Sequence, residues 1–219
     1  MEALDTAKIK QIAWDKLDGK WTQAAVAVLV FILISIVIDI PSTFFEKDST
    51  GRSVWNIIET PFALGLDIGL YAYFLNLARN KEIPLKRLVV GFTSGWGFYF
   101  NLICTQILAL LFICLWALLF IIPGIMKAFS YSLIYFIILD HPEYSHFEVL
   151  QKSSNMMYGH RMELFVLCLR FIPWILLGIV TCGIGFLWAC PYITTAFCEF
   201  YLQLKAKNED SPEVVTNAK

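Results

Sequence analysis

Long apolar runs separated by short polar segments dominate the pattern of residues along the chain. A helix needs roughly 20 residues to cross a hydrocarbon core of about 30 Å, and six runs reach or approach that length. They occupy residues 22–40, 57–77, 98–122, 126–139, 162–180 and 184–204. The pattern predicts an all-α, polytopic membrane protein with about six transmembrane helices arranged as three hairpins.

The fourth run, residues 126–139, is the shortest of the six. Its length also fits a re-entrant segment that enters and leaves the bilayer on one side. Pro123 and Gly124 directly precede it and predict a tight connection from the third run. We therefore take it as a span, with five spans or a re-entrant segment as the alternatives.

A short amphipathic stretch that ends in glycine precedes each hairpin. Such stretches suit the headgroup boundary of a bilayer, and glycine permits the left-handed turn that redirects the chain. The residues of each stripe and the glycines are Ile9, Ala13, Leu17, Trp21 and Gly19, then Leu85, Leu88, Val89, Phe92 and Gly95, then Phe147, Leu150, Ser154, Met157 and Gly159. The sequence thus predicts three interfacial helices.

The third of these helices also carries a start signal, because Ser145 and Glu148 have the spacing of a capping box. The chain then divides into three units near residues 3–77, 85–140 and 147–204. Each unit begins on the same side of the membrane, so the units would be parallel repeats. The alternative is that any chain with an even number of spans alternates in this way.

Lysine and arginine are distributed asymmetrically between the two sets of connections. By the positive-inside rule, the richer side faces the cytoplasm. Thirteen of the 17 basic residues lie on one side: Lys8, Lys10, Lys16, Lys20, Arg79, Lys81, Lys86, Arg87, Lys152, Arg161, Lys205, Lys207 and Lys219. The opposite connections hold Lys47, Arg52 and Lys127. We expect one integral-membrane domain over residues 1–205, both termini in the cytoplasm, and a disordered cytoplasmic tail over 206–219.

The composition supports a membrane protein and excludes several other classes. Hydrophobic residues make up 58% of the chain, charged residues 16%, and mean hydropathy is +0.64. The net charge of −1 gives no field that would attract nucleic acid. The six cysteines lie in or beside apolar runs and form no CxxC pair, so we expect them to pack helices rather than bind a metal or cofactor.

Ionisable residues inside the apolar runs are the candidate binding residues, because each is costly there unless it is paired or hydrated. Arg170 in the fifth run is close in expected depth to Asp67 in the second and Glu199 in the sixth. One hypothesis is a polar pocket in which Arg170 contacts an anion and either acid is its counter-ion. The alternative is a buried ion pair that only fixes helix register.

No catalytic motif of the common hydrolase or nucleotide-binding types is present. The segment from His141 to His146 offers two histidines and Glu143. Their spacing matches no metal motif, and a helix cap explains the segment more simply. A membrane-embedded hydrolase that uses this segment is therefore the weakest of the functional alternatives.

The C-terminal two thirds of the chain contain a set of short motifs. They are Leu115-Trp116, Ile121–Ile125, Tyr131-Ser132, Asp140, Pro142, Ser153, Ser154, Met157, Gly159-His160, Leu164-Phe165, Trp174, Gly183–Gly185, Pro191-Tyr192 and Phe200-Tyr201. In their order and spacing these motifs resemble a bacterial integral-membrane family, domain-of-unknown-function family 975. The resemblance implies a multi-span bacterial membrane protein and brings no activity with it, and we expect the protein in the bacterial inner membrane. A fainter similarity to membrane domains that accompany glycerophosphodiester phosphodiesterases hints at lipid-related work.

Together these observations favour a non-enzymatic module that binds or transports a lipid or other amphiphile. The expected partners are membrane lipids and, in the alternative of an accessory subunit, another membrane protein. We expect no cofactor, no metal and no nucleic-acid partner.

Overall fold

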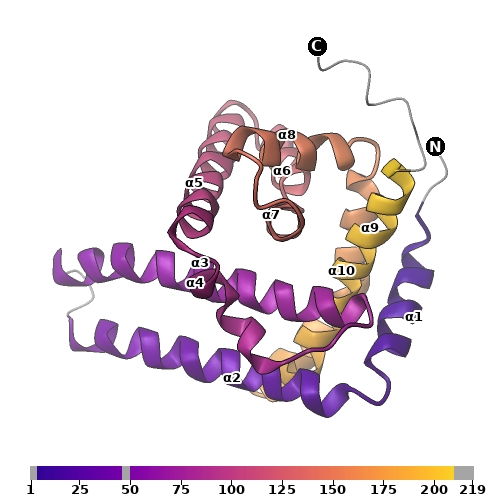
Figure 1. Cartoon of the computed structure of the whole chain (residues 1–219), viewed down its shortest axis with the longest axis horizontal. Helices are drawn as coiled ribbons and strands as arrows, with labels where there is room; N and C mark the ends of the chain where they lie inside the picture. The colour runs from indigo at the N-terminus through magenta and orange to yellow at the C-terminus, as the bar shows by residue number, and fades with distance from the viewer. Residues whose placement is uncertain (1–3, 46–49, 210–219) are drawn as a thin grey trace.

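The computed structural model describes residues 4–45 and 50–209, and this part of the chain is helical with no strand. Figure 1 shows the arrangement of the helices. Their bounds are α1 Thr6–Leu17, α2 Trp21–Asp39, η1 Ile40–Phe44, α3 Thr50–Ala78, η2 Leu85–Val89, α4 Val90–Thr93, α5 Trp96–Leu119, α6 Ile121–Ser130, α7 Ile134–Asp140, α8 His146–Met156, α9 Arg161–Val180 and α10 Phe186–Glu209.

Five helical segments in the described residues are long and apolar enough to cross a membrane, as in a multi-pass membrane protein. They are Trp21–Phe44, Thr50–Ala78, Trp96–Leu119, Ile121–Asp140 and Arg161–Val180. The sixth expected span, residues 184–204, corresponds to α10, which is not among them. Residues 206–209 continue α10 instead of starting the expected disordered tail, and the rest of that tail lies outside the described residues.

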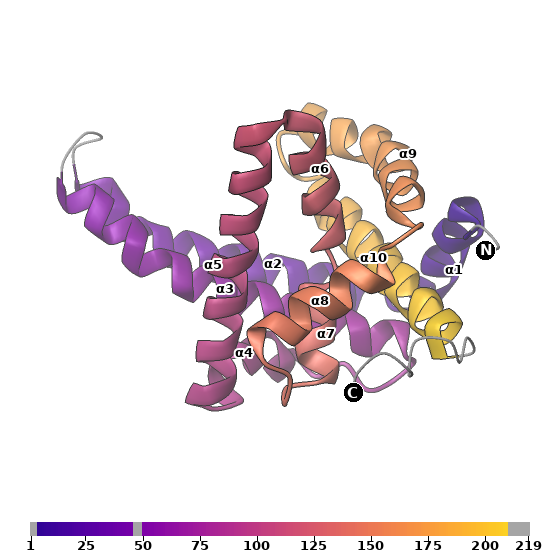
Figure 2. The ribbon, with the colours of Figure 1, turned by 90° about the horizontal axis from the view of Figure 1, so that it is seen from above.

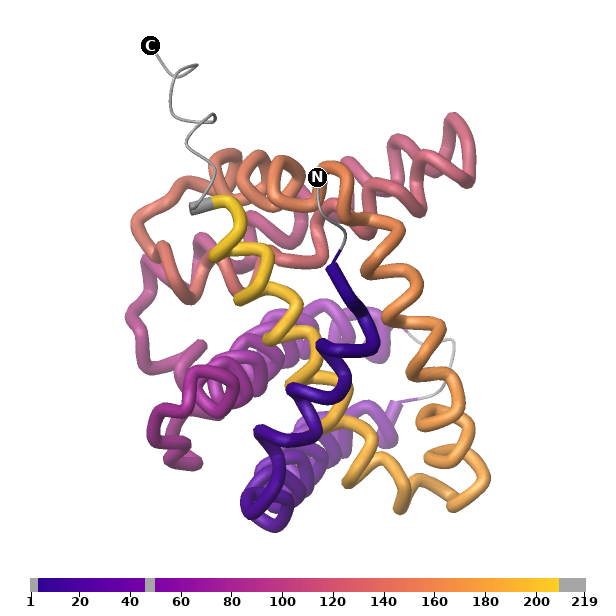
Figure 3. The backbone as a smooth tube through the Cα atoms, turned by 90° about the vertical axis from the view of Figure 1, so that its right-hand side faces the viewer, coloured from indigo at the N-terminus to yellow at the C-terminus, as the bar shows by residue number. Residues whose placement is uncertain are grey.

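α10 packs against α1, α2, α3 and α9 (Figures 1 and 3). Its buried side chains include Thr195, Glu199 and Tyr201. A helix that packs against several other helices can carry polar side chains, because neighbouring protein groups can hydrogen-bond to them whereas lipid tails cannot. This burial explains why α10 is less apolar than the other long helices.

The fourth apolar run forms two short helices, α6 and α7, joined by a turn at residues 131–133. The tight connection expected at Pro123 and Gly124 is wrong, because both residues lie inside α6. The chain instead turns at Phe120, whose backbone is extended (φ −154°, ψ 137°). Pro123 is tolerated in the first turn of a helix, where its missing N–H has no partner to lose.

α2 and α3 lie side by side and project away from the other helices (Figures 1 and 2). α5 and α6 also pack together but point in another direction (Figure 2). The projecting part of α2 and α3 carries exposed apolar side chains, including Leu33, Val37 and Ile57. This surface is suited to lipid rather than to water.

The apolar stripe expected on the first amphipathic helix is present, but it faces protein. Ile9, Ala13 and Leu17 of α1 are fully buried, and α1 packs against α10 (Figure 3). The three glycines that end the amphipathic stretches all have positive φ: 72° at Gly19, 97° at Gly95 and 82° at Gly159. The prediction of left-handed turns at these glycines is confirmed.

On α8 the capping box of Ser145 and Glu148 is confirmed, and hydrogen bonds from Ser145 hold the pKa of Glu148 below its usual range. Of the expected stripe, Leu150 and Met157 are buried, but the Phe147 side chain is 63% exposed. The buried face of α8 also includes Val149 and Ser153. Ser153 is drawn inward because its hydroxyl donates a 2.7 Å hydrogen bond to the carbonyl oxygen of Ser130.

α3 is held against the η2 segment by a close backbone approach at Gly69, where a Cβ atom would overlap the carbonyl oxygen of Leu88. We expect Gly69→Ala to destabilise the fold by about 2 kcal/mol, because overpacking forces backbone shifts. The measurement is the thermal midpoint of the detergent-solubilised protein. Gly97→Ala is the control, since a Cβ there meets nothing within 4 Å. Equal midpoints for the two variants would contradict this packing.

Candidate functional site

The three residues expected to form a polar cluster are not joined to one another. Arg170 lies on an exposed face of α9, and its backbone carbonyl oxygen accepts a hydrogen bond of 3.5 Å from Lys10. Glu199 is buried on α10 and forms an ion pair of 2.7 Å with Lys16 of α1. Within the described residues, no ion pair connects Arg170 to Asp67 or Glu199. The structure supplies Glu199 with a different cation, from outside the apolar runs.

Asp67 is half-buried on α3, in the middle of an apolar helix. It lies within electrostatic reach of Tyr71 and Tyr135, whose rings stack with centroids 4.8 Å apart. The two tyrosines join α3 to α7. Asp67 therefore belongs to the contact between α3 and α7.

Lys16 joins three helices at one end of the bundle. Besides its ion pair with Glu199 of α10, its ammonium group donates to the backbone carbonyl of Ala78, the last residue of α3. A helix leaves its last carbonyl groups without intrahelical partners, and a lysine can satisfy them. Lys16 thereby fixes the end of α3 and neutralises the buried carboxylate of α10 at once.

A second polar cluster is centred on Asp140, the last residue of α7. One of its carboxylate oxygens, Oδ2, accepts from Arg79 at 2.6 Å, from Lys205 at 2.7 Å and from the Tyr201 hydroxyl at 2.8 Å. Arg79 directly follows α3, whereas Tyr201 and Lys205 lie one turn apart on α10. The Asp140 cluster thus connects the ends of α3, α7 and α10.

The environment of the Asp140 cluster favours the charged form of Arg79. The Asp140 side chain is only 7% exposed, and its two cationic partners are about three-quarters buried, at 24% and 28% exposed. Burial alone lowers the pKa of Arg79, but the hydrogen bond and negative charge of Asp140 outweigh it and raise that pKa. Charge-assisted hydrogen bonds of this kind are the strongest in proteins.

Sequence reasoning missed this cluster because it searched for charges inside the apolar runs. A usable signal was nevertheless present. Arg79, Asp140 and Lys205 each lie one or two residues beyond the expected end of an apolar run, on the side rich in basic residues. Residues just beyond the ends of spans on the same side of the membrane lie at a similar depth, so their side chains can reach one another.

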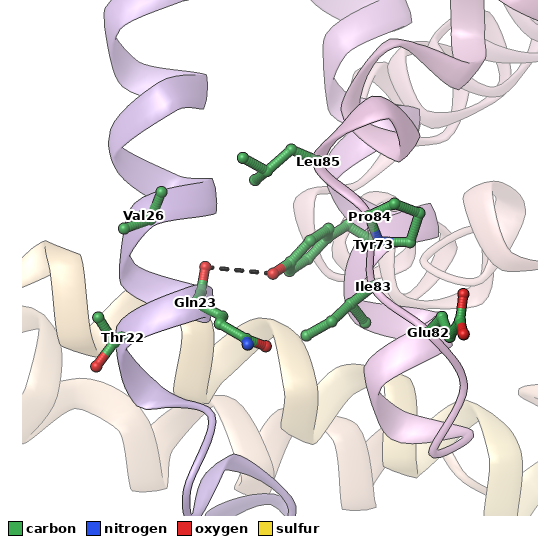
Figure 4. Close-up of a pocket in the computed structure, with 8 residues that line it drawn as sticks. All are labelled: Thr22, Gln23, Val26, Tyr73, Glu82, Ile83, Pro84 and Leu85. Carbon is green, nitrogen blue, oxygen red and sulfur yellow. Dashed lines mark hydrogen bonds between the residues drawn. The ribbon is translucent and has the colours of Figure 1, made fainter.

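A cavity of about 550 Å³ opens between the first turns of α2 and the connection from α3 to η2 (Figure 4). Val26 and Leu85 lie at one end, and the Gln23 amide extends toward Ile83 nearer the other (Figure 4). The hydroxyl of Tyr73 donates a 3.2 Å hydrogen bond to the Gln23 carbonyl oxygen and closes the inner wall. The remaining lining residues are Thr22, Glu82 and Pro84.

The histidine segment does not converge on a common point. His141 Nδ1 lies 3.1 Å from Glu143, whereas His146 Nδ1 lies 3.0 Å from Asn101 of α5. In the part of the chain that the structure describes, no group of three or more His, Cys, Asp or Glu side chains is placed to hold a metal ion. The geometry gives this segment a role in joining α5 to α8.

Comparison with known proteins gives one family. The chain matches the family described as "Protein of unknown function (DUF975)" over residues 1–130 and 118–208. No curated protein and no solved structure matches the chain.

Asp140→Asn tests the importance of the cluster. We expect a loss of about 2 kcal/mol, because the change leaves two buried cations without their counter-charge. The measurement is the thermal midpoint in detergent, which should fall by roughly 5 °C. Glu143→Gln is the matched control, since that side chain is 64% exposed and pairs only with His141 among the residues described. A midpoint unchanged by Asp140→Asn would mean that the cluster contributes nothing to stability.

Proposed function

The chain belongs to the DUF975 family, whose description carries no activity, and we propose that it binds a membrane amphiphile without converting it chemically. The observation that carries the proposal is that the cavity in Figure 4 is lined by apolar side chains at one end and also by polar groups. Val26 and Leu85 offer apolar contacts at one end, whereas Thr22 and Gln23 offer a hydroxyl and an amide. Sites for amphiphiles combine a mainly apolar wall with a few polar groups that orient the ligand.

The level of this cavity in the membrane supports the same proposal. Thr22 and Gln23 belong to the first turn of α2, on the side that the basic residues mark as cytoplasmic. A lipid whose headgroup lies near Thr22 would direct its chains toward Val26 and the hydrocarbon core. The proposed ligand is therefore a lipid or lipid-like molecule of the cytoplasmic leaflet.

The proposed topology has six spans in three hairpins in the bacterial inner membrane, with α10 as the sixth span and both termini in the cytoplasm. The asymmetry of lysine and arginine supports it, because thirteen basic residues lie on one side and three on the other. Short amphipathic segments, among them α1 and α8, would lie at the cytoplasmic surface before each hairpin.

Val26→Phe should fill the apolar end of the cavity. We expect the variant to retain at most about a tenth of the lipid that co-purifies with the wild type, because a contact loss of about 1.4 kcal/mol is tenfold in affinity. The measurement is native mass spectrometry after gentle detergent extraction. Val37→Phe is the matched control, because it places the same side chain on an exposed part of the same helix.

Equal lipid retention by the two valine variants would overturn the proposed site. Retention of a second membrane protein, rather than lipid, by the wild type would instead favour the accessory-subunit alternative. The exposed apolar surface of α2 is the observation that supports that alternative, since the buried residues of α2 are Ala24, Ala27 and Val28.

The topology is tested separately, with fluorescent or enzymatic reporters fused to each end of the chain. If the chain has six spans, a reporter that is active only in the cytoplasm should be active when it is fused to either end. The reason is that an even number of crossings returns the chain to its starting side. Reporters on opposite faces of the membrane would show an odd number of spans and would remove α10 from the set.

A further inference from the structure

A shallow cleft of about 440 Å³ lies beside the Asp140 cluster, apart from the cavity of Figure 4. It is lined by Arg79, Asp140, Leu202, Lys205 and Ala206. The carboxylate and both cations of the cluster thus belong to its walls. Lys205 also lines a small adjoining hollow, of about 70 Å³, together with His141 and Lys152.

The charges in this cleft are not balanced. Two cations, Arg79 and Lys205, share the single carboxylate of Asp140 and contact it through one oxygen. A guanidinium has five N–H donors and an ammonium has three, so each cation keeps donors beyond the one it gives to Asp140. The side chains of Arg79 and Lys205 remain about a quarter exposed. The cleft therefore offers positive charge and available donors to a ligand.

We propose that this cleft binds a phosphate-bearing ligand through Arg79 and Lys205. A phosphate group supplies several strong acceptor oxygens and negative charge, which matches a pair of cations held a short distance apart. Asp140 positions the two cations and prevents them from separating when no ligand is bound. A volume of about 440 Å³ exceeds that of inorganic phosphate and leaves room for the organic part of a phosphate ester.

The phosphate could belong to a lipid headgroup or to a soluble ester, because the cleft lies where the helices end. The experiment uses the full-length protein in micelles of a maltoside detergent, which carries no phosphate. Glycerol 3-phosphate is titrated by calorimetry with glycerol as the control. Retention of phosphatidic acid is compared with that of diacylglycerol by native mass spectrometry.

The decisive variants are Ala206→Glu and Ala206→Gln. Ala206 is exposed and lines the cleft, but it makes no contact within the Asp140 cluster. The glutamate adds a negative charge that should weaken phosphate binding about tenfold, whereas the neutral glutamine of the same size should have little effect. Lys205→Gln should weaken binding by at least as much, and Lys8→Gln, on an exposed part of α1, should not.

Binding of only the soluble probe would identify a phosphate ester as the ligand class, and binding of only phosphatidic acid would identify a lipid headgroup. If the wild type binds neither probe, or if Ala206→Glu binds as well as Ala206→Gln, the proposal is overturned. The test is independent of the proposed amphiphile cavity, because Val26→Phe should leave binding at this cleft unchanged.

Discussion

One carboxylate oxygen, Oδ2 of Asp140, joins three helices that are far apart in the sequence. Arg79 directly follows α3, Asp140 ends α7, and Lys205 lies near the end of α10. Residues more than 60 positions apart in the chain therefore meet at a single atom. Apolar contacts between helices hold them together but allow sliding, whereas a buried charge cluster permits only one alignment. We infer that the Asp140 cluster sets the relative positions of α3, α7 and α10.

The packing of α10 against α1 and α3 depends on a second charge pair. Glu199 is buried, and a buried carboxylate without a partner would be strongly destabilising. Lys16 neutralises it and also contacts the end of α3, so α1 is required for α10 to be covered. The buried face of α1, from Ile9 to Leu17, completes the cover. A segment that the sequence alone places at the membrane surface thus contributes to the core.

The sequence pattern predicted features that depend on position along one helix. The apolar runs, the left-handed turns at Gly19, Gly95 and Gly159 and the cap of α8 all depend on local spacing. Contacts that depend on the rotation of one helix relative to another were not predictable in this way. Helical rise gave Arg170 a depth near that of Glu199, but Arg170 faces outward on α9 and Lys16 takes the carboxylate. Depth alone cannot choose between partners, because several residues reach the same level from different helices.

The connection between α3 and η2 links the Asp140 cluster to the proposed ligand cavity. Its first residue, Arg79, is fixed by Asp140, and its last residues, from Glu82 to Pro84, form one wall of the cavity in Figure 4 together with Leu85 of η2. Between them Asn80 adopts a positive φ of 53°, a conformation that asparagine tolerates better than most residues. The backbone N–H of Lys81 then donates to the Asn76 carbonyl at 2.9 Å, which ties the connection back to α3. Because this short connection is held at both ends, it keeps the cavity wall in place without a large apolar contact. The shape of the cavity therefore depends on the ion pairs of Asp140, which also align the helices.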